Sequence, residues 1–454
     1  MLLGRPCGRG PSVLMMLNRL QLQLYFRRGF RSSVGRNALF LYLIQFAGYV
    51  LPFITVPYLV RVLGPERYGT LAFGQGLMAY FSTTVNYGFN FSATRKISVE
   101  RDDMEKVNRT AMEVWGAKAL LCAGCLFSLL ILLWAVPRVH QVSMLMLILF
   151  AGVAGRVLFP GWLFQGLEKM GPISAINLSV RLASVIAMFI LVRNPRDFLV
   201  YAAILSAGSL VAGLAGSGYA FRAFRLRLQW PGWGGIWQSL REGCVLFLSS
   251  AAIIMYTEGN AFILGLVASD AVVGYYTAAE RIVKAVANLW GPLSQALFPR
   301  FSRMVAESRH RTLRWGRRLL YVMGGMGLVM SAAVFTAAGL IVKVVLGSGF
   351  GPSVSVLRIL AVLPFLLAVS NVLGVQLMIP FGRERAVLYL VLAAGCLNIL
   401  LASLLAPIWK AEGMAASVLA AETVVTLAYF LYLWRAKLNP LQQTVLLPQP
   451  GPCA

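Results

Sequence analysis

Charged side chains occur inside long apolar stretches of this sequence, where each is costly and therefore informative. Five are basic and two are acidic: Arg156, Arg181, Arg281, Lys284 and Arg358, with Glu258 and Glu280. A charge at the centre of a bilayer costs about 2.5–3.5 kcal/mol on insertion scales, so such groups usually face a partner or a water-filled cavity. Because two acids cannot neutralise five bases, the excess favours an anionic ligand in a water-filled cavity.

The spacing of these charges predicts individual roles. Glu280 and Lys284 are four residues apart and can pair on one helix, whereas Arg281 and Lys284 share a face. Glu258 is a candidate carboxylate for proton or cation coupling, with a structural salt bridge as an equal alternative. We therefore predict that the ligand is bound by Arg281, Lys284, Arg181, Arg156 and Asn260, and that coupling uses Glu258 and Glu280. Arg358, near a helix end, is expected to extend its guanidinium to the lipid headgroups.

Other kinds of chemistry find little support in the sequence. The two histidines, His140 and His310, cannot form a metal or acid–base site by themselves. Cys122 and Cys125 form a C-x-x-C inside an apolar run with no second pair, which favours packing over redox chemistry or metal binding. Neither a G-x-x-x-x-G-K-[ST] phosphate loop nor a G-x-S-x-G motif occurs. We expect no catalytic site, no metal and no cofactor.

The elements that carry these charges are predicted to be membrane-spanning helices. Of the 454 residues, 59% are hydrophobic and only 13% are charged, and the mean hydropathy is +0.74. Soluble proteins carry roughly 25% charged residues. Twelve apolar runs are each long enough to cross a hydrocarbon core of ~30 Å: 38–60, 69–91, 111–136, 142–166, 172–192, 198–221, 243–269, 271–297, 319–346, 353–380, 386–408 and 413–434. The fold class is therefore all-α integral membrane, with twelve transmembrane helices.

The distribution of Lys and Arg predicts the orientation. With an even number of spans both termini lie on one side, and that side would hold 29 of the 41 basic residues against seven on the other. The positive-inside rule then makes both termini cytoplasmic, in a multi-pass protein of the membrane. The net charge of +25 is thereby explained without a nucleic-acid partner.

A weak internal repeat suggests two halves. The segments 63–71 and 268–276 align Gly69 with Gly274 at an offset of 205, although chance resemblance between apolar segments is an alternative. The predicted organisation is a basic cytoplasmic tail at 1–36, a six-helix bundle at 37–221, a basic linker at 222–242, a second bundle at 243–434 and a cytoplasmic tail at 435–454. Such halves would be related by a pseudo-two-fold axis along the membrane normal. Ser209, Gly213 and Ser217 form a small-residue stripe expected to serve close helix packing.

Several segments resemble one known family. They are LYLIQFAGYVLPFITVPYLVRVLGPERYG (41–69), NYGFNFSATRKI (86–97), AAERI (278–282), LFPRFS (297–302), PFGRE (380–384) and GMAASVLAAE (413–422). Together they resemble the Wzx-type O-antigen and polysaccharide flippases of the multidrug/oligosaccharidyl-lipid/polysaccharide exporter superfamily. The resemblance covers about 38–434, and its motifs add Arg61 to the expected substrate-binding residues.

The resemblance implies movement of an undecaprenyl-diphosphate-linked oligosaccharide from the inner to the outer leaflet of the bacterial inner membrane by alternating access. It also implies two six-helix bundles in a V shape, around a cationic cavity. The expected partners are that lipid, a proton or sodium ion and the bilayer, with a polysaccharide polymerase as a further candidate; we expect a monomer and no enzyme activity. One alternative is a cation-coupled multidrug exporter of the same fold. The other is a membrane-embedded polysaccharide polymerase or ligase, but the short outer loops argue against that second alternative.

Overall fold

The computed structural model of the chain describes residues 33–441, apart from the side chains of 33–50 and of a few positions between 52 and 296. The predicted tails at 1–36 and 435–454 lie for the most part outside the described residues. Every regular element within 33–441 is helical. This agrees with the predicted all-α class.

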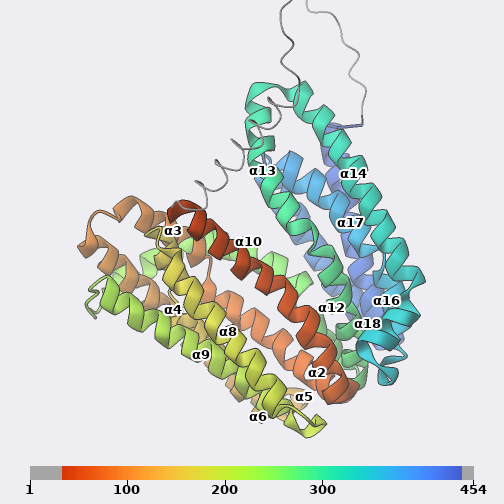
Figure 1. Cartoon of the computed structure of the whole chain (residues 1–454), viewed down its shortest axis with the longest axis horizontal. Helices are drawn as coiled ribbons and strands as arrows, with labels where there is room; N and C mark the ends of the chain where they lie inside the picture. The colour runs from red at the N-terminus through yellow and green to blue at the C-terminus, as the bar shows by residue number, and fades with distance from the viewer. Residues whose placement is uncertain (1–32, 442–454) are drawn as a thin grey trace, which may run out of the picture.

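The first half of the chain forms helices that gather on one side of the molecule (Figure 1). They are α2 (Ser33–Asn86), α3 (Phe89–Glu100), α4 (Met104–Ala135), α5 (Pro137–His140), α6 (Ser143–Leu158), α7 (Gly161–Gly166), α8 (Met170–Leu191), the short η1 (Pro195–Asp197) and α9 (Phe198–Ala223). Helix α2 bends at Gly64, whose φ of 71° and ψ of 172° are not helical, so it consists of two helices in sequence. Glycine permits this conformation because it lacks a Cβ atom.

The second half begins with α10 (Gly232–Thr257), α11 (Asn260–Val267), α12 (Asp270–Ala287), α13 (Trp290–Glu307) and α14 (Arg309–Thr336). It continues through α15 (Ala338–Ile341), η2 (Val342–Leu346), η3 (Ser348–Phe350), α16 (Ser353–Leu360), α17 (Leu363–Ser370), the π-helical η4 (Asn371–Met378) and α18 (Glu384–Arg435). Helix α18 bends at Lys410. Helix α10 starts within the expected linker 222–242, because Ile236 and Leu240 are buried in a cluster with residues of α3 and α4.

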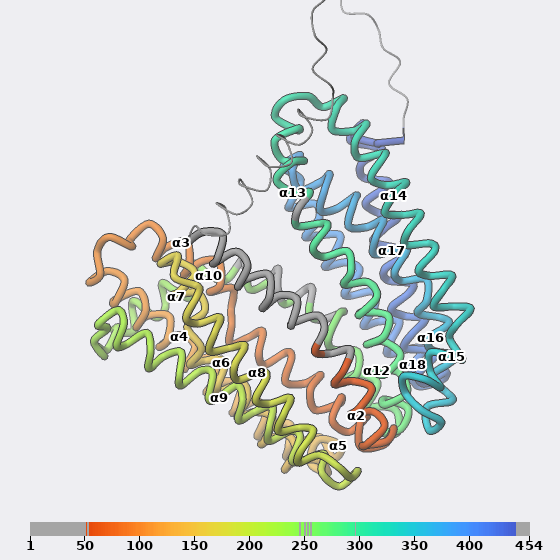
Figure 2. Tube along the Cα trace, viewed as in Figure 1, coloured from red at the N-terminus to blue at the C-terminus, as the bar shows by residue number. Residues whose placement is uncertain are grey.

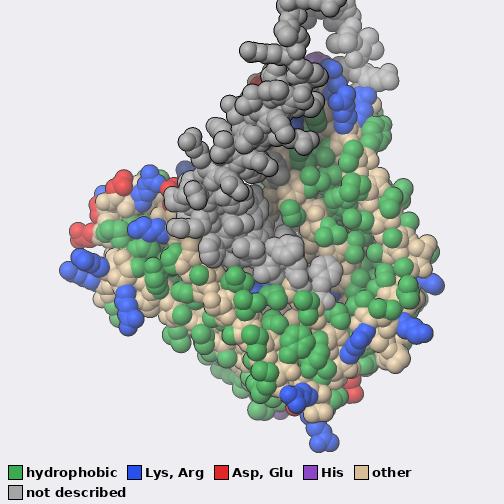
Figure 3. Space-filling view, viewed as in Figure 1, with side chains coloured by type: hydrophobic (Ala, Val, Ile, Leu, Met, Phe, Trp, Pro, Cys, Tyr) green, Lys and Arg blue, Asp and Glu red, His purple; other side chains and the backbone are tan. Residues whose placement is uncertain are grey.

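The described helices have the character of membrane spans. Seven are long and apolar enough to cross a bilayer: Met104–Ala135, Ser143–Gly166, Met170–Leu191, Pro195–Ala223, Arg309–Thr336, Ser353–Met378 and Glu384–Arg435. Large hydrophobic side chains such as Phe127, Val329 and Leu404 are exposed along them, and Figure 3 shows hydrophobic flanks with charged side chains gathered toward the ends. The chain is therefore a multi-pass membrane protein.

The two groups of helices share a core at one end and separate at the other. A single hydrophobic cluster joins Phe73 of α2 to Tyr276 of α12 and Leu357 of α16. Toward the other end the cores are distinct, with Trp162 in one group and Phe301 in the other. The result is the V-shaped outline of Figure 1. Helix α10 connects the two groups, because its start packs into the core around Trp162.

Helices α2 and α12 lie side by side where the two groups meet (Figure 2). Two glycines bring them into close contact there. A Cβ atom on Gly69 of α2 would lie 2.7 Å from the backbone nitrogen of Gly274 and closer still to the carbonyl oxygen of Asp270. A Cβ atom on Gly274 of α12 would lie 2.9 Å from the carbonyl carbon of Pro65. The two contacts are reciprocal, since Pro65 and Asp270 are separated by the same 205 positions as the two glycines.

Small residues also hold α9 against α6. The Ser209 hydroxyl donates to the Gly152 carbonyl over 2.8 Å, and Ser217 donates to the Leu158 carbonyl. A Cβ atom on Gly213 would lie 2.9 Å from the Leu158 Cβ atom. The predicted packing role of this stripe is confirmed.

Candidate functional site

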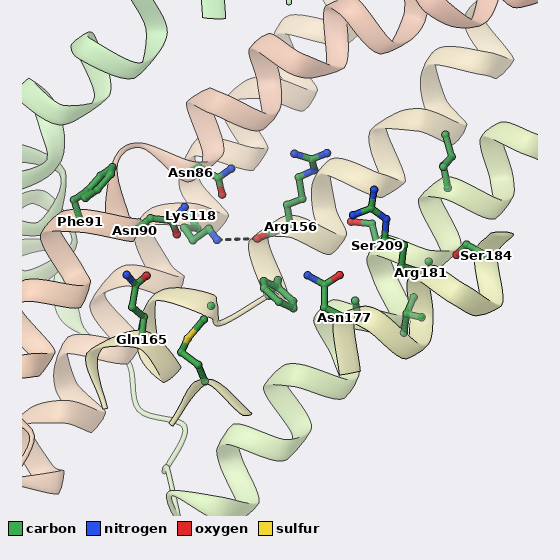
Figure 4. A pocket seen from close by; sticks show the side chains of 17 residues that line it. Asn86, Asn90, Phe91, Lys118, Arg156, Gln165, Asn177, Arg181, Ser184 and Ser209 are labelled. Carbon is green, nitrogen blue, oxygen red and sulfur yellow. Dashed lines mark hydrogen bonds between the residues drawn. The ribbon is translucent and has the colours of Figure 1, made fainter. Parts of the chain in front are cut away.

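A basic cavity of about 650 Å³ lies within the first group of helices. Arg156 comes from α6, Arg181 from α8 and Lys118 from α4, and all three line it (Figure 4). No acidic side chain is among the lining residues. The side chains that line the cavity therefore carry a net positive charge, which favours an anionic occupant.

Lys118 is the cation that sequence reasoning missed. Its side chain is only 2% exposed, and its Nζ atom donates to the backbone carbonyl of Arg156 over 2.7 Å. From the sequence alone, Lys118 is assigned to the cytoplasmic basic residues that set the orientation, because it lies near the start of the apolar run 111–136. The missed signal was its position seven residues after the start of that run, which is too far into the helix for a side chain of the flanking loop.

Uncharged polar groups complete the lining of the cavity. Amide side chains come from Asn86, Asn90, Gln165 and Asn177, while Ser184 and Ser209 add hydroxyls. Figure 4 shows Gln165 and Asn177 among the side chains that surround the cavity with Lys118 and Arg156. Amides offer both donors and acceptors, as sugar hydroxyls require, and guanidinium groups suit phosphate oxygens. The lining can thus bind a ligand that combines phosphate with sugar.

A second polar cluster joins α10, α11 and α12 in the second group. Lys284 Nζ lies 3.3 Å from Glu258 Oε1 and 3.4 Å from Glu280 Oε1. The predicted pairing of Glu280 with Lys284 is confirmed, and Glu258 shares the same ammonium group. The shared ammonium group offsets part of the cost of removing the two carboxylates from water.

Asn260 is buried at the centre of this cluster. Its Nδ2 atom lies 3.5 Å from Glu280 Oε1, and its Oδ1 atom accepts from Asn398 Nδ2 over 2.9 Å. Tyr276 also donates its hydroxyl to Glu280 Oε1 over 3.0 Å. Asn260 is 1% exposed, so in this conformation it positions Glu280 and does not face a cavity.

Arg281 connects the two groups of helices. Its Nη2 atom donates to Gln75 Oε1 of α2 over 2.6 Å, and its guanidinium lies over the Tyr68 ring at 5.4 Å from the centroid. Arg61 makes a similar connection through a hydrogen bond from Nη2 to the carbonyl of Val344. The structure therefore brings Arg156 and Arg181 together in one cavity and places Arg281, Lys284 and Arg61 outside its lining.

Comparison with known proteins decides the family. The family model described as "Polysaccharide biosynthesis protein" matches residues 34–305. The chain belongs to this family. Its relatives include two proteins named "Putative O-antigen transporter". The one from Escherichia coli (strain K12) is 32% identical over 89% of this chain and 98% of its own length. The one from Shigella dysenteriae is 30% identical over 86% of this chain and 98% of its own length.

Solved structures of transport proteins share the fold of this polysaccharide biosynthesis family member. The lipid II flippase MurJ in an inward closed conformation superposes with a TM-score of 0.72, at 11% identity over 88% of this chain and 87% of MurJ. An inward-facing multidrug resistance MATE family transporter superposes with a TM-score of 0.67, at 14% identity over 85% of this chain and 94% of its own. The chain thus has the fold of these membrane transport proteins, and its relatives are named as transporters and not as catalytic enzymes.

Proposed function

We propose that this polysaccharide biosynthesis protein is a flippase for an undecaprenyl-diphosphate-linked oligosaccharide, such as an O-antigen repeat unit. It would move this lipid from the cytoplasmic to the outer leaflet of the bacterial inner membrane. The observation that carries the proposal is the basic cavity, in which Lys118, Arg156 and Arg181 face no acid among the lining residues. The diphosphate would neutralise these cations, the amides would bind sugars, and the polyprenyl tail would stay in the lipid.

The architecture proposed for this activity is twelve spans in two six-helix bundles related by a pseudo-two-fold axis along the membrane normal. The reciprocal contacts of Gly69 with Asp270 and of Gly274 with Pro65 support it, because a two-fold relation generates such pairs. The halves then comprise residues 37–221 and 243–434, with the connection at 222–242.

The orientation of the proposed transporter follows from its basic loops. The expected cytoplasmic segments 95–118 and 300–318 lie at the ends of α3, α4, α13 and α14, where the two groups diverge (Figure 1). The V therefore opens toward the cytoplasm, with both termini on that side. Alternating access requires the opposite end, closed at Gly69 and Gly274, to open in its turn.

Energy for transport would come from a proton or sodium gradient. The sequence indicates Glu258 and Glu280 as candidate carboxylates that bind the coupling ion. A multidrug exporter of the same fold is the main alternative, but it would need an acidic cavity for organic cations. A polymerase stays a candidate partner of the flippase, which would itself act as a monomer.

The proposal is tested in proteoliposomes that contain a fluorescent undecaprenyl-diphosphate-linked oligosaccharide. Transfer between leaflets is followed by the access of a membrane-impermeant reagent to the sugar. The variant combining Arg156→Gln and Arg181→Gln should lower transfer at least about tenfold, since each lost charge-assisted hydrogen bond contributes about 1.5–3 kcal/mol. Equal transfer by wild type and double variant would refute the role of the cavity.

The matched control is Arg358→Gln. This residue is another arginine within an apolar helix, but its guanidinium lies over the Phe335 ring at 5.9 Å from the centroid and outside the cavity. Its transfer rate should stay close to that of the wild type. Transport of an organic cation in place of the lipid would instead support the exporter alternative.

A further inference from the structure

Glu422 is a carboxyl group deep within the second group of helices that the sequence analysis did not count among the intramembrane charges. It lies on α18 between the bend at Lys410 and the helix end at Arg435. Twelve and thirteen residues separate it from these two points, so it is about 18 Å from either one. The side chain is 6% exposed. It is therefore near the middle of the membrane whichever way the protein faces.

The surroundings of Glu422 contain little that could stabilise an ionised carboxylate. Ser370 of α17 donates its hydroxyl to Glu422 Oε1 over 3.1 Å. Among the side chains that the structure describes, no Lys, Arg or His forms an ion pair with Glu422. Within the described part of the chain, no charged side chain of the helices packed against Glu422 forms an ion pair with it, and its titratable neighbour is Tyr429 on the same helix.

This environment differs in kind from that of Glu258 and Glu280. Those two carboxylates share the ammonium group of Lys284. For Glu422, one neutral hydroxyl donor offsets only a small part of the cost of removing a carboxylate from water. The side chain is stable in this position as the neutral acid and needs water before it can ionise.

The backbone beside Glu422 is irregular. Helix α17 ends at Ser370 and continues as the π-helix η4. Its first residue, Asn371, has a buried Oδ1 atom that accepts no hydrogen bond from the residues that the structure describes. An apolar groove of about 450 Å³ lies nearby: Val369 and Thr426 line it, whereas Glu422 and Ser370 do not. Short π-helical segments often occur at functional sites, and this one leaves the Asn371 Oδ1 atom as an acceptor for water when the helices rearrange.

We propose that Glu422 is the proton-binding group of this transporter, a site that deepens the proposed flippase function and rests on it. In the conformation described here the carboxyl group is protonated and dry. When the second group of helices changes conformation, water reaches it, the O–H bond breaks and the proton passes to that water. The carboxylate later takes a proton from water on the other side of the membrane. One carboxylate and one hydroxyl offer too few oxygens for a metal cation, which is held by several oxygen ligands.

Infrared difference spectroscopy of the reconstituted full-length protein tests protonation without reference to transport. The wild type should show the carbonyl-stretch band of a protonated carboxylic acid at neutral pH, and Glu422→Gln should abolish it. The matched control is Glu412→Gln on the same helix, where Ser355 Oγ donates to Glu412 Oε1 over 2.6 Å at the helix bend. A band that survives in Glu422→Gln would overturn the proposal, even if the protein proves not to be a flippase.

A second measurement connects the proton to transport. A gradient of about one pH unit can bias transfer by up to about tenfold for each coupled proton. In proteoliposomes, the ratio of transfer with and without the gradient should fall to about one for Glu422→Gln, whereas Glu422→Asp and Glu412→Gln should respond to the gradient. If Glu258→Gln abolishes the response and Glu422→Gln retains it, coupling belongs to the Glu258 cluster and the proposal is wrong.

Discussion

The crossing of α2 and α12 depends on two residues that have no side chain, and an alanine at either position should push the helices apart. Gly69→Ala places a Cβ atom 2.7 Å from the Gly274 nitrogen. Ordinary contact distances involving carbon begin near roughly 3.5 Å. The helices must therefore separate by at least about 0.8 Å, and by more to clear the carbonyl oxygen of Asp270.

The free-energy cost of this substitution can be bounded. Overpacking of a well-packed contact costs about 1–3 kcal/mol, and here the obstacle is backbone, which cannot rotate away. The cost applies only to the conformation in which this end is closed. The equilibrium between the closed and open states of this end should therefore shift about 5- to 150-fold toward the open state.

Electron spin resonance distance measurements provide the assay. Spin labels are attached to cysteines introduced at the exposed positions Arg196 of η1 and Lys343 of η2, in a background without native cysteines. Gly69→Ala should enlarge the population with a long distance between labels. Gly218→Ala is the matched control, because a Cβ atom there has no neighbour within 4 Å. An unchanged distance distribution in folded Gly69→Ala protein would refute the reasoning.

Three further predictions follow from the polar clusters. Lys118→Met should leave thermal stability unchanged or higher, because it removes a buried cation that has no acid partner among the described side chains. The same variant should bind inorganic pyrophosphate more weakly in a calorimetric titration. Lower stability with unaltered pyrophosphate binding would contradict this prediction. Arg281→Glu should abolish export of surface polysaccharide at normal protein levels, because it removes the donor to Gln75 and reverses a charge. Normal export would exclude the role of this residue. Asp270→Asn should weaken the closed end, since it removes the ion pair to Arg138. The pair is partly exposed, so the expected effect is only about 1 kcal/mol, and the label distances at 196 and 343 should lengthen slightly.

Many individual residues of the candidate site could be predicted from the sequence, but the sequence could not show which of them lie together. The sequence identified Arg156 and Arg181 as costly charges, and it paired Glu280 with Lys284 from their spacing on one helix. It could not tell that Arg281 faces α2 while Lys284 faces Glu258, because three residues along a helix turn the side chains by only about 60° and either could face a cavity. Lys118 was missed because it was counted with the basic residues of the cytoplasmic segment 95–118. Glu422 was missed because its segment, 413–422, was considered only for the family resemblance.

The sequence by itself determined that this protein is helical, lies in the membrane and carries excess positive charge within its spans. These properties depend on composition and on the length of apolar runs, which act locally and without reference to partners. Only the tertiary structure decided which charges are neutralised, since that depends on atoms from helices far apart in the chain. Lys284 lies between two carboxylates, the lining of the basic cavity contains no acidic side chain, and among the described side chains Glu422 accepts a hydrogen bond from Ser370 and forms no ion pair. The cost of a buried charge is set by such neighbours, and so is its function.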